Sequence, residues 1–252
     1  MPRAERTIRV EAIVLQHSDW GEADRLLRLF TREQGKLRAI ANGARKMQSR
    51  KAGHLEPFMR SRLMLAKGHD MWIVTQAEVI DDYSVLREDL QTTARAAYVI
   101  ELLDRLTYEE GQNWQLFDLV SKTLTRLVEQ SDHFVPIHYY EMRILDLTGY
   151  RPLLFECASC RKEIKAEDQF FSAEMGGVLC PNCGARSVGS RLISMDALRF
   201  LRHFQRSTYN ESLKASPSAK SSSEIESILN YYLTYLLERG LNSTEFLKQI
   251  QS

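Results

Sequence analysis

The sequence predicts an α+β protein in which a small N-terminal barrel precedes an all-helical domain with an inserted four-cysteine module. Three observations lead to this prediction. Residues 7 to 80 contain short β-branched segments separated by turn residues, the apolar spacing becomes helical from about residue 88, and all four cysteines lie between residues 157 and 183. We therefore expect two domains, 1–80 and 81–252, with the cysteine module at about 153–190 in the second.

The first domain contains five predicted strands, TIRVEAIVL, DRLLRLFTRE, KLRAIAN, LEPFMRSRLMLAK and MWIVTQAEVI. Gly35 supplies the turn of a predicted hairpin between the second and third segments. Pro57 cannot donate a hydrogen bond to a ladder, so we expect it at a strand start or edge. Five short strands without a strong helix between them favour a five-stranded OB-fold, with an SH3-like barrel or an open sheet as the alternatives.

The second domain shows apolar residues at helical spacing, which is typical of helices that pack one face against a core. Five helices are expected, the last of them over SSSEIESILNYYLTYLLERG. The predicted core faces of the other four are Val99, Leu102, Leu103 and Leu106; Phe117, Val120, Leu124 and Leu127; Ile137, Tyr140, Ile144 and Leu145; and Ala197, Phe200, Leu201 and Phe204.

Helix boundaries are marked by capping residues and breakers. Asn113 and Ser194 are predicted N-caps, and Ser221 with Glu224 has the spacing of a capping box. Residues 210–222 are predicted to be a polar loop. Three further boundary residues are Pro136 in the first turn of the third helix, Gly149 just past its end, and Gly240 at the end of the last helix.

The formal net charge of +1 hides an uneven distribution along the chain. Residues 1–80 carry 15 Lys and Arg against nine Asp and Glu, and residues 34–68 carry nine basic residues against Glu56 alone. This concentration favours a polyanionic partner. The candidate phosphate contacts are Lys36, Arg38, Arg45, Lys46, Arg50, Lys51, Arg60 and Arg62. Phe30, Phe58 and Trp72 are candidates for base stacking, with core packing as the alternative.

The cysteines have the spacing of a zinc site. Two C-x2-C pairs, Cys157 with Cys160 and Cys180 with Cys183, are separated by 19 residues, which is typical of a four-cysteine zinc module. Four thiolates leave no position open for water or substrate, so we expect one structural Zn²⁺ per chain. A redox dithiol or a metal-free set of cysteines are the alternatives.

Motifs of the common enzyme classes are absent from the sequence, including the P-loop, the dinucleotide fingerprint, H-E-x-x-H and G-x-S-x-G. No apolar run approaches the ~18 residues of a membrane span, and the N-terminus lacks a secretory signal pattern. We expect a cytoplasmic, non-enzymatic DNA-binding protein. The rival classes are a protein–protein adaptor whose basic half docks on acidic partners, and a nuclease or other metal-dependent enzyme.

Two segments resemble the RecO recombination mediators of bacteria. EAIVLQHSDWGEADRLLRLFTREQGKLRAIANGARKMQSRKAGHLEPF is similar to the N-terminal signature of that family: a strand, a W-G/S-E turn, a strand ending in FT, then G-x-x-R, GAR and L-x-P-F. YYEMRILDLTGYRPLLFECASC resembles the helix, the L-x-x-x-G-Y turn and the first zinc knuckle of the members that carry four cysteines. Some members lack these cysteines, which implies that the metal is not essential to the activity of the family.

The resemblance implies an N-terminal OB-fold, a helical C-terminal domain with the zinc module, and a function in recombinational DNA repair. It implies binding of single- and double-stranded DNA, annealing of complementary strands, and help in loading RecA onto DNA coated by single-strand-binding protein. RecR and the acidic C-terminal tail of single-strand-binding protein are the implied partners, and RecA is an indirect one. Such a protein is expected in the cytoplasm, associated with the nucleoid.

Overall fold

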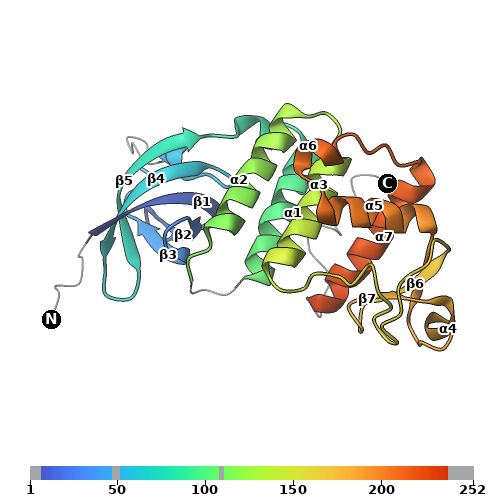
Figure 1. The fold of residues 1–252 in the computed structure, drawn as a ribbon. Helices are drawn as coiled ribbons and strands as arrows, with labels where there is room; N and C mark the ends of the chain where they lie inside the picture. Colours follow the sequence, from blue (N-terminus) through green and yellow to red (C-terminus); the bar gives the residue numbers. More distant parts are fainter. Residues whose placement is uncertain (1–6, 47–51, 108–110, 238–252) are drawn as a thin grey trace. The chain divides into compact units, whose positions relative to one another are not determined.

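The computed structural model describes residues 7–46, 52–107 and 111–237 (Figure 1). These residues divide into two compact units, one that ends at Gln130 and one that begins at Ser131. The first unit contains a barrel and helices α1 (Leu90–Leu106) and α2 (Trp114–Glu129). The second unit contains the other α-helices and the four cysteines.

Five strands form a closed barrel in the order β1-β2-β3-β5-β4. All neighbouring strands are antiparallel except β3 and β5, which pair in parallel. This order is that of the OB-fold, so the predicted five-stranded barrel is confirmed. The strands are β1 (Thr7–Trp20), β2 (Asp24–Thr31), β3 (Gly35–Ala41), β4 (Arg60–Lys67) and β5 (Trp72–Asp81).

The barrel core comes from the alternation of side chains along each strand, because every second residue faces inward. Small and branched residues fill the interior, and all of them are fully or almost fully buried. The strand residues of this core are Val10, Ala12, Val14, Leu27, Leu29, Ala39, Ala41, Leu63, Leu65 and Val74. The residues between them face outward, and these include Arg28, Arg38 and Arg62.

The strand β4 begins later than the sequence pattern predicts. Residues 55–59 form bends and turns, with a short 3-10 helix η1 (Ala52–His54) before them. The assignment of this segment to a strand with Pro57 at its start was therefore wrong. Pro57 has no N–H, and Phe58 takes a left-handed φ of 74°, which interrupts the extended backbone.

Helices α1 and α2 complete the first unit. The side chain of Asp89 caps α1, and Asn113 caps α2 by accepting a bond from the backbone N–H of Leu116 at 3.0 Å, as predicted. The predicted core faces of both helices are buried. Phe117 of α2 stacks on Phe30 of β2 with 6.2 Å between ring centroids, so α2 packs on the outside of the barrel.

The second unit packs α3, α5 and α7 against one another and adds a three-stranded sheet in the order β7-β6-β8. Most of the predicted helix-face residues are buried, whereas Ile137 and Phe200 are only partly buried. No helix among the described residues is long and apolar enough to cross a membrane. The elements are α3 (Phe134–Leu147), β6 (Gln169–Ser172), β7 (Gly177–Leu179), α4 (Pro181–Gly184), β8 (Arg191–Ile193), α5 (Met195–Arg206), α6 (Tyr209–Ser212) and α7 (Ala219–Leu236).

Most predicted helix boundaries of the second unit are confirmed. Ser194 caps α5, Pro136 lies in the first turn of α3, and Gly149 follows the end of that helix at a φ of 86°. The predicted capping pair of the last helix was wrong, because Ser218 caps α7. Glu224 instead accepts bonds from the backbone N–H and the hydroxyl of Ser194.

The segment 210–222 is not the continuous loop that its polar composition suggests. Helix α6 runs to Ser212, and α7 already begins at Ala219. Thr208 and Glu211 form a capping box at α6, a local arrangement that compensates for the lack of apolar residues. Gly240, predicted to end the last helix, lies outside the described residues.

Candidate nucleic-acid interface and metal centre

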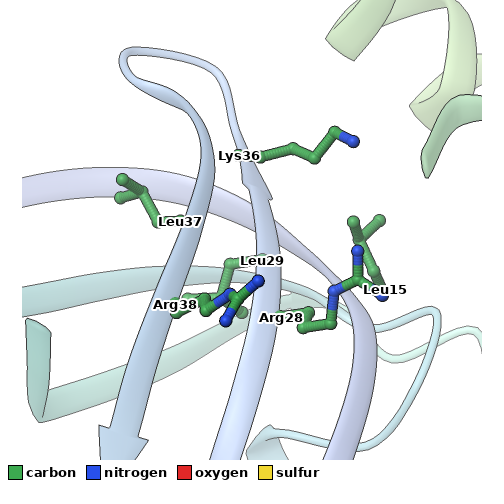
Figure 2. A pocket seen from close by; sticks show the side chains of 6 residues that line it. All are labelled: Leu15, Arg28, Leu29, Lys36, Leu37 and Arg38. Atoms are coloured by element: carbon green, nitrogen blue, oxygen red, sulfur yellow. The ribbon is translucent and has the colours of Figure 1, made fainter. Parts of the chain in front are cut away.

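Three basic side chains project from neighbouring strands of the barrel around a small hollow (Figure 2). Arg28 of β2 and Arg38 of β3 are directly opposite each other in the ladder, and Lys36 lies two residues from Arg38 on β3. The hollow has an empty volume of about 290 Å³, and Leu15, Leu29 and Leu37 also line it. Like charges that face each other across a ladder destabilise it, so this surface favours an anion.

Asp104 of α1 neutralises part of this positive charge. Its carboxylate accepts a bond from Arg28 at 2.7 Å and one from Lys36 at 3.2 Å, and its backbone carbonyl accepts a second bond from Lys36. The side chain of Lys36 is 10% exposed, whereas that of Arg28 is 40% exposed. Lys36 and Arg28 therefore both tie α1 to the barrel, Arg28 with a partly exposed side chain, while Arg38 is exposed.

The loop after β3 is bonded to the turn between β1 and β2. The backbone N–H of Arg45 donates to the carbonyl of Ala23 at 2.9 Å, and its guanidinium pairs with Asp19 at 3.1 Å. Lys46 follows and is exposed. A solvent-exposed ion pair of this kind contributes about 0–1 kcal/mol, so Arg45 can exchange its carboxylate for a phosphate at small cost. Arg50 and Lys51 lie outside the described residues.

Arg60 and Arg62 lie on β4 and bind carboxylates of neighbouring strands. Arg60 contacts Glu11 and pairs with Asp81 at 2.9 Å, while Arg62 pairs with Glu78 at 3.0 Å. Burial is the largest single effect and lowers the pKa of Arg60, but the bond and charge of Glu11 together with the charges of Tyr83 and Asp81 raise the pKa overall. In the barrel β1 separates β4 from β2, so these two arginines do not join the group at the hollow.

Six of the eight predicted phosphate contacts lie among the described residues, and they are distributed over three places in the barrel. The sequence did not single out Arg28, because it lies outside the basic run between residues 34 and 68. The alternation of core and outward-facing positions in DRLLRLF indicates its exposure: Leu27 and Leu29 face the core, so Arg28 between them faces outward.

The three predicted stacking residues are not available on the surface. Phe30 is 2% exposed and Phe58 is 7% exposed, and Trp72 packs against the barrel core. Phe30 and Trp72 lie in strands, where apolar residues fill the core or the contact with α2, and Phe58 is buried in the turn before β4. Trp20, at the end of β1, is 46% exposed and was not among the candidates.

The four cysteines converge on one point in the second unit, as predicted. Their sulfur atoms all lie within 4.8 Å of one another, and the Sγ atoms of Cys160 and Cys180 are 3.9 Å apart. Cys157 is buried and the other three are partly or fully exposed. Four thiol ligands at such distances fit a tetrahedral ion such as Zn²⁺.

Two tight turns present the sulfurs. In the first, the backbone N–H of Arg161 donates to the carbonyl of Cys157 at 2.9 Å, and Arg161 takes a left-handed φ of 61°. In the second, Pro181 begins the short helix α4, and the backbone N–H of Gly184 donates to the carbonyl of Cys180 at 2.8 Å. A backbone hydrogen bond thus closes each C-x2-C turn.

The thiols do not all ionise together. Burial opposes ionisation of Cys157, but backbone N–H groups of Cys160 and Cys180 outweigh it and lower its pKa to about 6. A hydrogen bond with Cys180 is the main cause that raises the pKa of Cys183 to about 12. A divalent cation would remove this conflict, because it stabilises the thiolate form of every ligand. The donor set therefore fits a metal ion.

The chain is therefore a two-part protein: an OB-fold barrel is followed by a helical unit whose four cysteines could hold a metal ion. Residues 5–83 match the family described as "Recombination protein O N terminal", and residues 87–245 match "Recombination protein O C terminal". The chain therefore belongs to the recombination protein O (RecO) family and has a role in DNA repair and recombination.

Several curated proteins named "DNA repair protein RecO" are similar over most of this chain. The one from Roseiflexus sp. (strain RS-1) is 39% identical over 249 residues, which covers 98% of this chain and 87% of that protein. The one from Pelotomaculum thermopropionicum is 35% identical over 239 residues, with 95% and 93% covered. The one from Dehalococcoides mccartyi (strain CBDB1) is 32% identical over 231 residues, with 92% and 91% covered.

Proposed function

We propose that this protein binds single- and double-stranded DNA through the outer surface of its barrel and anneals complementary strands. The observation that carries the proposal is the direct opposition of Arg28 and Arg38 in the ladder. Both guanidinium groups lie on one outer face of the barrel, and a phosphate beside them can accept charge-assisted hydrogen bonds from both. The backbone of DNA offers such phosphates without regard to base sequence.

Annealing follows from the same charge. Two complementary strands repel each other through their phosphates, and a cationic surface that holds both lowers this repulsion and raises their encounter rate. The basic residues on the loop after β3 extend the surface beyond the hollow, so a second strand finds contacts at Arg45 and Lys46. No bond is made or broken in this process, and we propose that the protein is not an enzyme.

We further propose that the protein acts with RecR to load RecA onto DNA coated by single-strand-binding protein, whose acidic tail it binds. Membership of the family and the resemblance of two long segments support this assignment of partners. We assign DNA binding to residues 1–80 and the helical part to 81–252, in the cytoplasm and associated with the nucleoid. The four cysteines hold one structural Zn²⁺ per chain, which fixes the fold of the segment at about 153–190 and takes no part in chemistry.

The test is a strand-annealing assay with fluorescent oligonucleotides across a salt series. The double variant Arg28→Gln/Arg38→Gln and the loop variant Arg45→Ala/Lys46→Ala/Arg50→Ala/Lys51→Ala should both slow annealing and weaken binding to unrelated DNA sequences equally. The control Arg151→Gln/Arg199→Gln removes two exposed charges from the second unit and should anneal at the normal rate. Normal annealing by both barrel variants would contradict the proposal.

A second candidate function is that of an adaptor whose basic half docks on acidic protein partners. The observation in its favour is that Lys36, Arg60 and Arg62 already bind carboxylates within the first unit. A surface that accepts carboxylates from its own chain can accept them from a partner. Gel shift with naked DNA and pull-down with an acidic peptide separate the two functions, because an adaptor shifts no DNA at physiological salt.

A further inference from the structure

We propose that Trp20 stacks on an unpaired nucleobase and makes the barrel prefer single-stranded over double-stranded DNA. The inference rests on the proposed DNA binding and deepens it, because it adds the residue that recognises the unpaired strand. None of the sequence-based candidates for this role is exposed. Trp20 is suited to this role by its position in the strand register, by the exposure of its side chain and by the charges beside it.

The register places Trp20 on the same face as the two arginines. Across β1 and β2, Trp20 is opposite Asp24, Ser18 is opposite Leu26, and Gln16 is opposite Arg28. Across β2 and β3, Arg28 is opposite Arg38. Directly opposite residues share one face of a sheet, and so do residues two apart on a strand. Trp20 and the arginine pair therefore mark the two ends of one outer face.

This face is long enough for a segment of extended single strand. Gln16, which is opposite Arg28, is four residues from Trp20, and a strand rises about 3.3 Å per residue, so about 13 Å separate the two rows. Leu26 and Ile40 are also directly opposite each other and lie partly buried between these rows. A strand bound along the face would place phosphates at the arginines and a base at Trp20.

The helices of the first unit leave this part of the face open. Phe30, two residues beyond Arg28 on β2, stacks on Phe117 of α2, and Lys36 is bonded to Asp104 of α1. That end of the face is covered. Next to that end Arg38 is exposed, and at the far end of the face Trp20 is 46% exposed.

The turn that carries Trp20 is held firmly, so the indole is preorganised for stacking. The backbone N–H of Gly43 donates to the carboxylate of Asp24 at 2.7 Å, and that of Arg45 donates to the carbonyl of Ala23 at 2.9 Å. These bonds bring the basic loop beside the turn. An exposed indole next to cationic side chains is the combination that binds single strands, because every base has a face that can stack.

Duplex DNA cannot use this site, because its bases are already stacked on their neighbours and paired. The phosphates of a duplex still reach the arginines. Trp20 should therefore contribute to single-strand affinity and hardly at all to duplex affinity. Since an indole releases no counterions from DNA, it should also leave the salt dependence of binding unchanged.

The experiment measures the affinity of the full-length Trp20→Ala variant for an oligothymidine strand and for a duplex by fluorescence anisotropy. We expect single-strand binding to weaken roughly 5- to 150-fold, the usual range for loss of one stacked base, with duplex binding and salt slope unchanged. Trp20→Phe should recover most of the loss. Trp114→Ala is the matched control, because Trp114 is 54% exposed in the same unit but lies on α2.

A second measurement does not depend on loss of binding. In a Trp72→Phe/Trp114→Phe background, Trp20 is the only indole of the chain, and its fluorescence should be quenched by single strands but not by duplex. Equal weakening of single-strand and duplex binding by Trp20→Ala, or no quenching, would overturn the inference. Wild-type protein that binds neither form of DNA at low salt would instead overturn the proposed function.

Discussion

Lys36 and Arg38 are neighbours on β3 and carry the same charge, yet the structure predicts opposite consequences of their removal. Lys36→Met removes two bonds to Asp104 from a side chain that is 10% exposed. Hydrogen bonds to charged groups contribute about 1.5–3 kcal/mol, and Arg28 still holds the carboxylate, so we expect a loss in the free energy of unfolding of about 2 kcal/mol. DNA affinity should change little.

Arg38→Gln should behave in the reverse way. Because Arg38 is exposed, we expect its replacement to change the free energy of unfolding by less than about 0.5 kcal/mol. One lost phosphate contact should lower the slope of log affinity against log salt by about 0.7 for single strands and about 0.9 for duplex.

The chain offers a convenient assay for this pair. All three tryptophans, Trp20, Trp72 and Trp114, lie in the first unit, so intrinsic fluorescence follows the unfolding of that unit alone. With an m-value of about 2 kcal/mol per molar, Lys36→Met should lower the urea midpoint by about 1 M. Anisotropy with labelled DNA gives the affinities. A Lys36→Met variant of normal stability that binds DNA weakly would refute this division between the two residues.

Three further predictions concern the metal centre, the packing of Gly184 beside it, and the carboxylate of Glu56 in the first unit. Purified protein should contain about one zinc per chain. Strong chelation or Cys183→Ser should reduce the helical content of the second unit and leave the tryptophan fluorescence of the first unit unchanged. Simultaneous loss of both signals would contradict this prediction. Gly184→Ala would place a Cβ 2.3 Å from the ring of Phe170, so we expect about 1–3 kcal/mol of destabilisation confined to the second unit. Circular dichroism melts measure this loss. The control Ala185→Ser, at the neighbouring exposed position, should have no effect in the same melts. Burial opposes ionisation of Glu56, but the bonds and charges of Arg25 and His17 together outweigh it and lower its pKa below the ordinary 4.5. Glu56→Gln should therefore destabilise the first unit at pH 7, and this effect should disappear as the pH falls through the lowered pKa. Urea midpoints at pH 7 and at a pH below the lowered pKa test the last point, and an equal loss at both would contradict it.

The barrel and the helices were predictable because apolar residues recur with a period of two residues in the strands and about 3.6 residues in the helices. The cysteine centre was predictable because two C-x2-C pairs closed by local turns depend on little beyond the segment itself. The start of β4 was not, since a single residue with positive φ, Phe58, decides it and nothing in its side chain indicates that conformation.

The candidate DNA surface was predicted only in part, and the reason is pairing between distant residues. A count of basic residues treats Lys36 and Arg60 alike, whereas the carboxylate partner of Lys36 comes from α1 and those of Arg60 come from β1 and β5. Such partners become visible only when register and packing bring them together. The exposed Trp20 was missed for a similar reason, because its position at the end of β1 depends on a strand longer than the pattern suggested.

The central claim is that the barrel binds DNA through its phosphates, and the salt dependence of single-strand affinity tests it most directly. If about five phosphates are contacted, affinity should fall roughly 100-fold between 50 and 200 mM salt, and Arg28→Gln/Arg38→Gln should visibly flatten the slope. An affinity that changes less than about threefold over this range, or a slope that the double variant leaves intact, would contradict the claim.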